Sequence, residues 1–387
     1  MFAVGWGANQ FSSLLLAYKL HRGLSQGTGD ALFGVYALGL IPALLVLGPV
    51  SDGRGRRAIT CGAGLLSGVA TCALIAGDHA VGLLYLGRLL AGVASGAAFA
   101  AGTAWVKELS VAPHDPGADA EAGARRAAIA LSAGFGCGPL VAGLLAQWAG
   151  DPLVSAYLPH LVIVALAVGP ALRAPETVRT APGGRSILVS SAASRRFRAV
   201  VAPSAPWVFI APSIAFAALP ALIVDDLGSF QVGFAALTAA LTLGVGVAVQ
   251  PLARRLDRVS PGRGLAVGLV CTLAGLLLAA LASAVSRWPP ALAADLLFGA
   301  GYGLCLVSGL LEVQALAAPG ELASLTAIFY ALTYVGFAAP LVVAELQHVL
   351  RAPLVLLAGA GLAALVLVRV VAAGRATRSS PTRASTL

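Results

Sequence analysis

The sequence predicts an all-α membrane protein with twelve transmembrane helices in two six-helix bundles, and three observations support this prediction. The chain of 387 residues is 59% hydrophobic and only 11% charged, whereas soluble domains carry about 25% charged residues. Its apolar residues form runs of about 20, the length of helix that crosses a bilayer core. A polar stretch near the midpoint leaves six of these runs on each side. The composition therefore argues against a water-soluble fold.

Each predicted helix is an apolar run bounded by short polar loops, which give its approximate ends. The predicted spans of the first half are 1–18, 31–50, 58–77, 82–106, 126–149 and 153–172. Those of the second half are 206–224, 230–250, 264–285, 289–315, 321–346 and 352–373. We therefore divide the chain into an N-terminal bundle, a cytoplasmic linker, a C-terminal bundle and a disordered tail, at 1–173, 174–205, 206–373 and 374–387.

The distribution of Lys and Arg predicts the orientation of these helices. The formal net charge is +9, but the basic residues form short clusters between apolar runs, so we expect no nucleic-acid partner. If both termini are cytoplasmic, the outer side holds only Lys19, Arg22, Arg287 and Arg351. The positive-inside rule favours that arrangement. We expect a multi-pass protein of the cell membrane whose basic linker is a solvated tether near anionic lipid, with a regulatory site as the alternative.

The turn between the second and third predicted spans has an unusual charge pattern. Its sequence, GPVSDGRGRR, places one Asp and three Arg between two apolar runs. Glycine at Gly55 permits a backbone turn that other residues disfavour, and Asp52 can pair with the Arg cluster. A basic anchor that only fixes topology would explain the Arg residues but neither Asp52 nor the glycines. The pattern therefore favours a gate over an anchor.

At this turn the sequence resembles the major facilitator superfamily, whose members carry a Gly-x-Leu-Ala-Asp-basic-x-Gly-basic-basic loop. The matching residues are Gly48, Asp52, Gly55, Arg56 and Arg57, with Gly53 where the family has a basic residue. The resemblance implies that Asp52 also faces the start of the eleventh span, around Pro319-Gly320-Glu321, when the cytoplasmic side is shut. The second-half turn from Gln250 to Arg258 has Arg254 in place of the Asp, so we expect it to contribute charge without the full latch.

Two further stretches are similar to motifs of this superfamily. GRLLAGVASG in the fourth span places Arg88, Gly92 and Gly96 on an Arg-x-x-x-Gly pattern. An arginine inside a membrane helix is costly and usually faces the bundle interior, although Arg88 could instead snorkel to the outer interface. GFGCGPLVAG in the fifth span resembles the antiporter motif, and its matching residues are Gly134, Gly138, Pro139 and Gly143. Small residues let helices approach closely, and we expect Gly244 and Ala248 of the eighth span to face them. Ordinary helix packing is the alternative.

Polar and aromatic residues at membrane depth are candidates for a substrate cavity and for energy coupling. The candidate cavity residues are Asn9, Gln10, Tyr36, Tyr302, Tyr330 and Tyr334. The candidate coupling residues are Arg88, Asp295 and Glu312. Asp295 lies well inside the tenth span, and burial disfavours the charged form of a carboxylate. We therefore expect Asp295 to be the proton-responsive group, with Arg88 as a charge across the cavity; an idle Asp295 at the outer interface is the alternative.

The resemblance implies a secondary active transporter that moves a small molecule by alternating access, with proton-coupled efflux of the drug/proton antiporter type as the expected mode. The first span offers no acid, which weakens the expectation of proton antiport. Two alternatives remain, an importer or facilitator of a polar metabolite and a non-transporting membrane sensor. The sequence contains no nucleotide-binding loop, catalytic triad or metal cluster. We therefore expect no enzyme, no cofactor and no metal, and a monomer whose partners are its substrate, protons and membrane lipid.

Overall fold

The computed structural model describes residues 1–78, 80–119, 122–178, 190–318 and 321–378, and in these ranges the secondary structure is helical. The first half contains α1 (Phe2–Asn9), η1 (Ser12–Leu14), α2 (Leu15–Arg22), α3 (Gln26–Arg54), α4 (Arg56–Ala76), α5 (Val81–Ala97), η2 (Ala98–Gly102), α6 (Thr103–Leu109), α7 (Ala122–Trp148), α8 (Pro152–Ser155) and α9 (Leu158–Arg173). The all-α prediction is confirmed. Helices suit a membrane because they satisfy their backbone polar groups internally where water is absent.

The second half is also built of helices. It contains η3 (Ser190–Ala193), η4 (Phe197–Val201), α10 (Ala202–Ser204), α11 (Trp207–Ser213), η5 (Ile214–Ala218), α12 (Leu219–Leu222), η6 (Val224–Asp226), η7 (Gly228–Phe230), α13 (Gln231–Ala248), α14 (Gln250–Val259), α15 (Arg263–Val285), α16 (Trp288–Leu316), α17 (Leu322–Tyr334), η8 (Val335–Ala338), α18 (Ala339–Leu346) and α19 (Ala352–Arg378). The segments η2, η4 and η5 are π turns.

Over the described residues, eleven helices are long and apolar enough to cross a membrane. The predicted first span falls outside this count because it is interrupted, with α1, η1 and α2 following one another as shorter pieces. At the break, Ser12 donates to the Asn9 carbonyl at 2.7 Å, and Ser13 donates across to the Pro139 carbonyl of α7 at 2.7 Å. The interrupted helix and the eleven continuous ones correspond to the twelve predicted spans.

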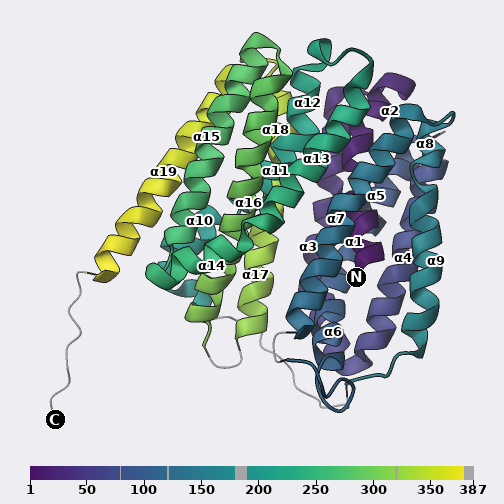
Figure 1. Cartoon of the computed structure of the whole chain (residues 1–387), viewed down its shortest axis with the longest axis vertical. Helices are drawn as coiled ribbons and strands as arrows, with labels where there is room; N and C mark the ends of the chain where they lie inside the picture. The colour runs from purple at the N-terminus through teal and green to yellow at the C-terminus, as the bar shows by residue number, and fades with distance from the viewer. Residues whose placement is uncertain (79, 120–121, 179–189, 319–320, 379–387) are drawn as a thin grey trace.

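The helices form two groups that lie side by side. Helices α1–α9 lie on one side of the molecule and α10–α19 on the other (Figure 1). Across the boundary, α3 packs against α17, η8 and α18, while α7 packs against α13. We call the end where α6 lies, at the bottom of Figure 1, the linker end, and the other the opposite end. The ranges 179–189, 319–320 and 379–387 of the predicted linker, eleventh-span start and tail lie outside the described residues.

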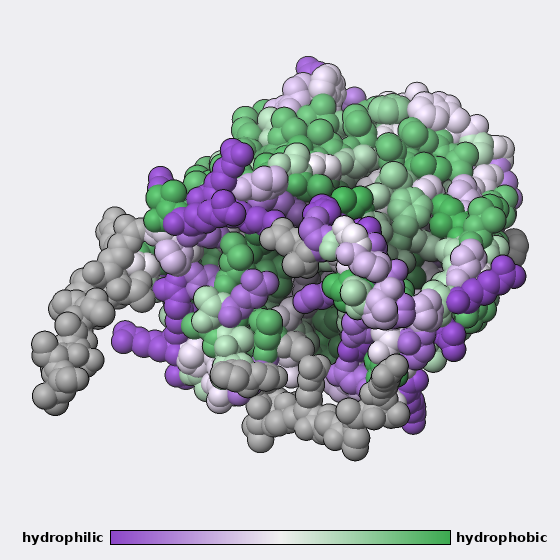
Figure 2. Space-filling view, turned by 60° about the horizontal axis from the view of Figure 1, so that its bottom comes forward, coloured by the Kyte–Doolittle hydropathy of each residue, from purple (hydrophilic) through white to green (hydrophobic). Residues whose placement is uncertain are grey.

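The surface and the core have the distribution expected of a membrane protein. Large apolar side chains on the flanks are exposed, among them Leu166 at 71%, Leu38 at 67% and Leu365 at 65%. Hydrophilic residues gather on the linker end and hydrophobic residues cover the flank above it (Figure 2). Exposed leucine on this scale fits contact with lipid tails rather than water. The protein is therefore a multi-pass membrane protein.

Helices α3 and α5 pack closely along a seam in which glycines bring the two backbones into direct contact. A Cβ atom at Gly92 would overlap the carbonyl oxygen of Tyr36, and one at Gly96 would meet the backbone of Leu40 and Leu44. On the facing helix, Gly39 lies in the same way against the Leu89 carbonyl. Such seams replace side-chain packing by direct backbone contact, which is how small residues bring membrane helices together. The seam positions Arg88, one turn before Gly92, against α3.

Candidate functional site

The predicted charged turn connects α3 and α4 at the linker end, and Gly55 makes the turn possible. Gly55 has φ of +100°, a region that residues with a side chain rarely adopt. A Cβ at this position would also overlap the carboxylate of Glu176. Glycine therefore provides both the backbone conformation and the room for a carboxylate from the linker.

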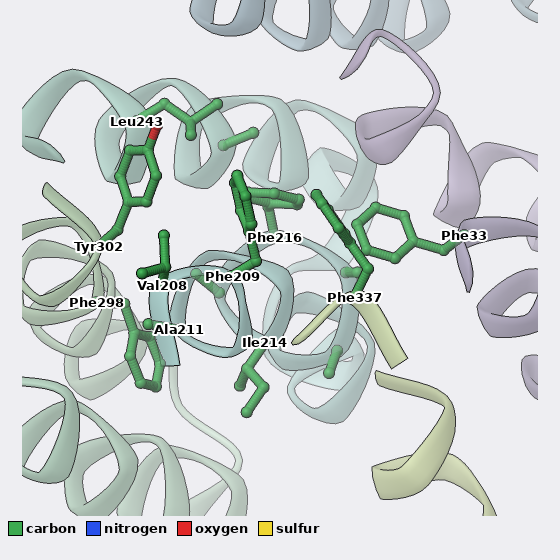
Figure 3. Close-up of a cluster of buried hydrophobic side chains, with 14 of the residues drawn as sticks. Phe33, Val208, Phe209, Ala211, Ile214, Phe216, Leu243, Phe298, Tyr302 and Phe337 are labelled. Carbon is green, nitrogen blue, oxygen red and sulfur yellow. The ribbon is translucent and has the colours of Figure 1, made fainter. Parts of the chain in front are cut away.

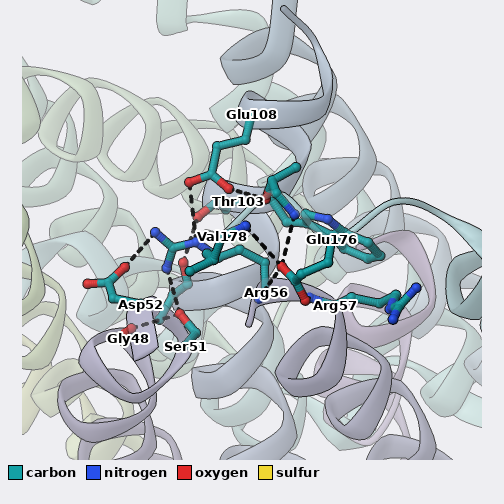
Figure 4. Close-up of polar contacts among 12 residues, drawn as sticks. Gly48, Ser51, Asp52, Arg56, Arg57, Thr103, Glu108, Glu176 and Val178 are labelled. Atoms are coloured by element: carbon teal, nitrogen blue, oxygen red, sulfur yellow. Dashed lines mark hydrogen bonds and ion pairs between the residues drawn. The ribbon is translucent and has the colours of Figure 1, made fainter. Parts of the chain in front are cut away.

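Arg56 is the centre of an ion-pair network at this turn (Figure 4). Its guanidinium lies 2.5 Å from Asp52 and 3.3 Å from Glu108 at the end of α6. It also donates to the Ser51 hydroxyl at 2.6 Å. The Arg56 side chain is 13% exposed, so the ion pairs are shielded in part from water. The network ties the second, third and fourth spans together, as the pairing predicted for Asp52 requires.

Glu176, which sequence reasoning missed, caps the N-terminus of α4. Its carboxylate accepts hydrogen bonds from the backbone amides of Arg56 at 2.8 Å and Arg57 at 3.0 Å (Figure 4). Burial raises the pKa of Glu176, but these amides and those of Thr177 and Val178 outweigh it and hold that pKa below its ordinary value. The only signal in the sequence was a carboxylate shortly after the sixth span, the kind of group that helix N-termini attract.

Of the other predicted contacts of the latch, only Glu321 belongs to the described residues. Pro319 and Gly320, which Asp52 was expected to face, lie outside the described residues. Glu321 next to them accepts hydrogen bonds from the amides of Ser190 at 3.0 Å and Ser191 at 2.9 Å. Hydrogen bonds from Ser191 and Ser190 lower the pKa of Glu321 to about 2. Glu321 thus holds the far side of the linker against the start of α17.

The second half has its own charged cluster at the linker end. Glu312, predicted as a coupling residue, binds Arg196 through two hydrogen bonds of 2.5 and 2.7 Å. That carboxylate raises the pKa of Arg196. In the second-half turn, Asp257 accepts the backbone amide of Gly264 at 2.9 Å and so caps α15. Glu312 is therefore one partner of an ion pair near the linker end of α16.

Arg88 is buried inside the first bundle and does not snorkel. It is 2% exposed and donates to the carbonyls of Leu32 at 3.1 Å and Ala8 at 3.3 Å. Its guanidinium carbon lies 4.8 Å from the ring centre of Phe11 and 4.7 Å from that of Tyr36. Carbonyl dipoles and ring faces both attract a cation. The predicted interior position of Arg88 is what the structure shows.

A small cavity, which we call the central cavity, lies at membrane depth between the two groups of helices. Its lining residues are Ala8, Asn9, Phe33, Tyr36, Arg88, Phe135, Phe209, Pro212, Phe216, Leu243, Tyr302, Tyr334 and Phe337. Its volume of about 20 Å³ is room for about one water molecule. Figure 3 shows Phe33, Phe337 and Phe209 lying next to one another from different elements. The cavity is therefore nearly closed in this conformation.

The structure places four of the six predicted cavity residues at the central cavity and two elsewhere. Asn9, Tyr36, Tyr302 and Tyr334 line the cavity as predicted. Gln10 does not, because its amide turns away and donates to the Thr71 hydroxyl at 3.0 Å. Tyr330 is also absent from the lining. Four of the phenylalanines that line the cavity, Phe33, Phe209, Phe216 and Phe337, were missed because a Phe in an apolar run gives no signal of which way it faces.

Asp295 is fully buried in α16 but does not line the central cavity. Both carboxyl oxygens lack a hydrogen-bond partner within the described part of the chain. The idle position at the outer interface is therefore wrong, and so is the expectation that Asp295 faces Arg88 across the cavity. An ionised carboxylate without donors is unfavourable in such surroundings, whereas a bound proton removes most of the penalty.

The glycines of the fifth span face a different helix from the one expected. A Cβ at Gly134 would overlap the Phe2 carbonyl oxygen, and one at Gly138 would lie 2.7 Å from the Trp6 carbonyl oxygen. Both belong to α1, so the expectation that Gly138 packs against the eighth span is wrong. Gly143 does face the eighth span, at Ala236. A Cβ at Gly244 would meet no atom within 4 Å, so Gly244 is not their partner.

No group of three side chains that could hold a metal occurs among the residues that the structure describes. The five cysteines are free, and Cys61 and Cys305 are buried. The arrangement thus offers a closed aromatic cavity with one cation, an isolated buried carboxyl group and a charged turn.

Comparisons with known proteins agree with this arrangement. Residues 1–218 match the family model described as Major Facilitator Superfamily. The fold is similar to nucleoside transporter NupG, with a TM-score of 0.70, 14% identity and 96% of each chain covered. It is similar to a POT family transporter in complex with 5-aminolevulinic acid, with a TM-score of 0.73, 13% identity and coverage of 96% of this chain and 94% of that one.

A third similar structure is the human organic anion transporter MFSD10 (TETRAN), with a TM-score of 0.65, 18% identity and coverage of 95% of this chain and 97% of that one. No curated protein sequence matches the chain. At these identities the likeness to solved structures shows the fold alone.

Proposed function

Because the chain belongs to the major facilitator superfamily, it is a membrane transporter rather than an enzyme, and we propose that it is a secondary active transporter of a small molecule. The observation that carries this proposal is that both halves line the central cavity. Asn9, Tyr36 and Arg88 come from the first half, while Phe209, Tyr302 and Tyr334 come from the second. A relative movement of the halves would open this cavity to one side or the other, as alternating access requires.

Contacts between the halves at the opposite end support a closed state on that side. The Gln147 amide donates to the Ser229 carbonyl at 2.7 Å, and its oxygen accepts the Gly233 amide at 2.8 Å. Next to them, the rings of Trp148 and Phe230 lie 6.1 Å apart. These three contacts join α7 to the start of α13. They would have to break for the cavity to open at the opposite end.

The network around Arg56 would control the linker end. It fixes the turn after α3 to α6 and to the linker through Asp52, Glu108 and Glu176. Opening there requires α3 to move past α17, which it contacts. We propose that the linker end faces the cytoplasm of the cell, with both termini on that side, because the Arg-rich turns are found there.

Energy coupling and direction belong to the same proposal. We assign the proton-responsive role to Asp295, whose carboxyl oxygens have no hydrogen-bond partner in the described residues. Protons moving inward would then drive efflux of the cargo. Import or facilitated exchange through the same cavity is the alternative, and a sensor without transport is another.

Uptake by proteoliposomes containing the full-length chain tests the proposal. Accumulation of dyes, antibiotics and sugars is measured with and without a pH gradient, and empty liposomes are the control. Uptake that depends on the gradient supports proton-coupled transport, whereas uptake that ignores the gradient indicates a facilitator. A correctly inserted chain that moves no compound contradicts transport and leaves the sensor.

A further inference from the structure

Aromatic rings form most of the wall of the central cavity. The rings of Phe209 and Tyr334 are stacked with centres 4.6 Å apart, and those of Phe209 and Phe337 with centres 4.8 Å apart. Phe337 also contacts Phe33 at 5.0 Å and Tyr36 at 5.9 Å on the first half. Offset or tilted ring pairs at such separations are favourable. A flat ring of a bound molecule would find the same kind of neighbours.

Arg88 is the one charged residue in this wall, and its charge is not neutralised. The lining contains no Asp or Glu. The described residues show no ion pair for Arg88, whose partners are the carbonyls of Leu32 and Ala8 and the rings of Phe11 and Tyr36. The dipoles of two carbonyls and the quadrupoles of two rings stabilise a buried cation less than the full negative charge of a counter-ion does. The hydroxyl of Tyr36 beside it is buried, close to the Ser95 side chain.

We propose that the central cavity binds an aromatic monoanion, with its carboxylate or similar group at Arg88 and its ring among Phe209, Tyr334 and Phe337. This inference rests on the proposed transport function and names the class of cargo. An anion supplies the missing counter-charge and can accept a hydrogen bond from the Tyr36 hydroxyl. A cation would be repelled by Arg88 without any acid in the wall to attract it, and a neutral molecule would leave the charge uncompensated.

The closed conformation shows what such a molecule would displace. The cavity of about 20 Å³ is too small for any ring, because the second-half rings stack on one another and meet the first-half rings of Phe33 and Tyr36 in tilted or edge-to-face contacts. Separation of the halves would break the contacts of Phe337 with Phe33 and Tyr36. A bound ring would then replace these contacts and hold the site open.

Calorimetric titration of the full-length chain in lipid nanodiscs tests the inference with matched probes. Each set keeps one ring and changes one group: benzoate, benzamide and benzylamine, and the corresponding three compounds of naphthalene. We expect the carboxylates to bind at least roughly tenfold more tightly than the amides, as hydrogen bonds between charged groups predict. The amines should show no binding.

Variants separate the roles of charge and ring. Arg88→Gln should bring the affinities for carboxylate and amide to the same value, and Arg88→Lys should keep part of the preference. Phe337→Leu should weaken carboxylate and amide by similar factors and so leave their ratio unchanged. Arg351→Gln, an exposed arginine at the opposite end, is the control and should bind like the wild type. Because Phe337→Leu keeps Arg88, it remains informative if Arg88→Gln fails to fold.

Amides or amines that bind as tightly as the carboxylates, or the absence of binding by all six probes, would overturn the inference. Uptake by proteoliposomes distinguishes this failure from failure of the proposed function. A chain that moves a neutral or cationic compound but binds no carboxylate is a transporter with another cargo. A chain that binds the carboxylates but moves neither them nor any other compound supports the site and contradicts transport.

Discussion

The carboxylate of Glu176 accepts the backbone amide of Arg56 at 2.8 Å, across 120 residues of sequence. The first residues of the linker are therefore fastened to the turn between α3 and α4 and are not a free tether. This contact couples the linker to the same arginine that pairs with Asp52 and Glu108. Any movement that opens the linker end has to carry Glu176 along or release it.

Replacing Glu176 by Gln should loosen the first turn of α4. Loss of a helix cap costs about 0.5–2 kcal/mol, so we expect the amides of Arg56 and Arg57 to exchange hydrogen about tenfold faster. Hydrogen–deuterium exchange of the full-length chain measures this. Glu321→Gln, which removes a carboxylate bound to Ser190 and Ser191, is the matched control and should leave the start of α4 unchanged.

The same contact predicts a pH dependence. The folded protein holds the pKa of Glu176 below its ordinary value of 4.5, so the ionised cap is favoured by folding. Its stabilisation is fully present above pH 4.5 and is lost as the pH falls through the lowered pKa. Protection of the Arg56 amide from hydrogen exchange, corrected for intrinsic exchange, should stay constant from neutral pH down to about pH 4.5 and decline below pH 4.5. A decline that begins near neutral pH would contradict the assignment.

Asp52→Asn should reduce transport strongly while leaving membrane insertion intact. The substitution removes the charge that Arg56 contacts at 2.5 Å, but the arginines that fix topology remain. Uptake by proteoliposomes and surface labelling measure the two effects. Asp115→Asn removes an exposed acid paired with Arg126 and should change neither. Normal transport by the Asp52 variant would end its assignment to the gate.

Gly138→Leu should disable transport, and the structure assigns the effect to α1 instead of α13. Even the Cβ of an alanine would lie 2.7 Å from the Trp6 carbonyl oxygen, so Gly138→Ala should destabilise the protein by about 1–3 kcal/mol. A Cβ at Gly136, two residues earlier in α7, would meet no atom within 4 Å. Gly136→Ala should therefore be tolerated. Thermal unfolding and uptake compare the two, and equal tolerance would show that α1 is not packed on Gly138.

Asp295→Asn should uncouple transport from the pH gradient while sparing downhill exchange. Because neither carboxyl oxygen has a partner in the described chain, the amide should also leave the unfolding temperature unchanged or raise it. Glu312→Gln breaks the pair with Arg196 and should lower that temperature. Accumulation that still follows the gradient in the Asp295 variant would place coupling elsewhere.

The sequence predicted those parts of the site that depend on neighbours along the chain. Asp52 and Arg56 are four residues apart, so their pairing follows from the helical geometry of the turn. The φ of Gly55 and the interior position of Arg88 were predictable for similar reasons, since glycine marks unusual backbone and charge avoids lipid. The twelve apolar runs likewise define the helices before any packing is known.

The remaining features depend on how the helices rotate and pack, which their composition leaves open. Gly138 belongs to a helix with glycine on several faces, so its contact with Trp6 could not be distinguished from one with α13. Tyr330 and Tyr334 are one turn apart in α17, yet only Tyr334 lines the cavity. Glu176 reaches α4 only because α9 returns the chain to the linker end.

The seam between α3 and α5 restricts which substitutions can be rescued by a second one. At Gly309 a new side chain would meet the ring of Phe329, and a smaller residue at 329 could restore the space. At Gly92 and Gly96 the obstacles include the backbone of Tyr36 and Leu40, and no exchange of side chains makes a backbone smaller. A second mutation can therefore compensate for a substitution at Gly309 but not for one at Gly92. Selection for revertants of a Gly92 variant should return glycine itself.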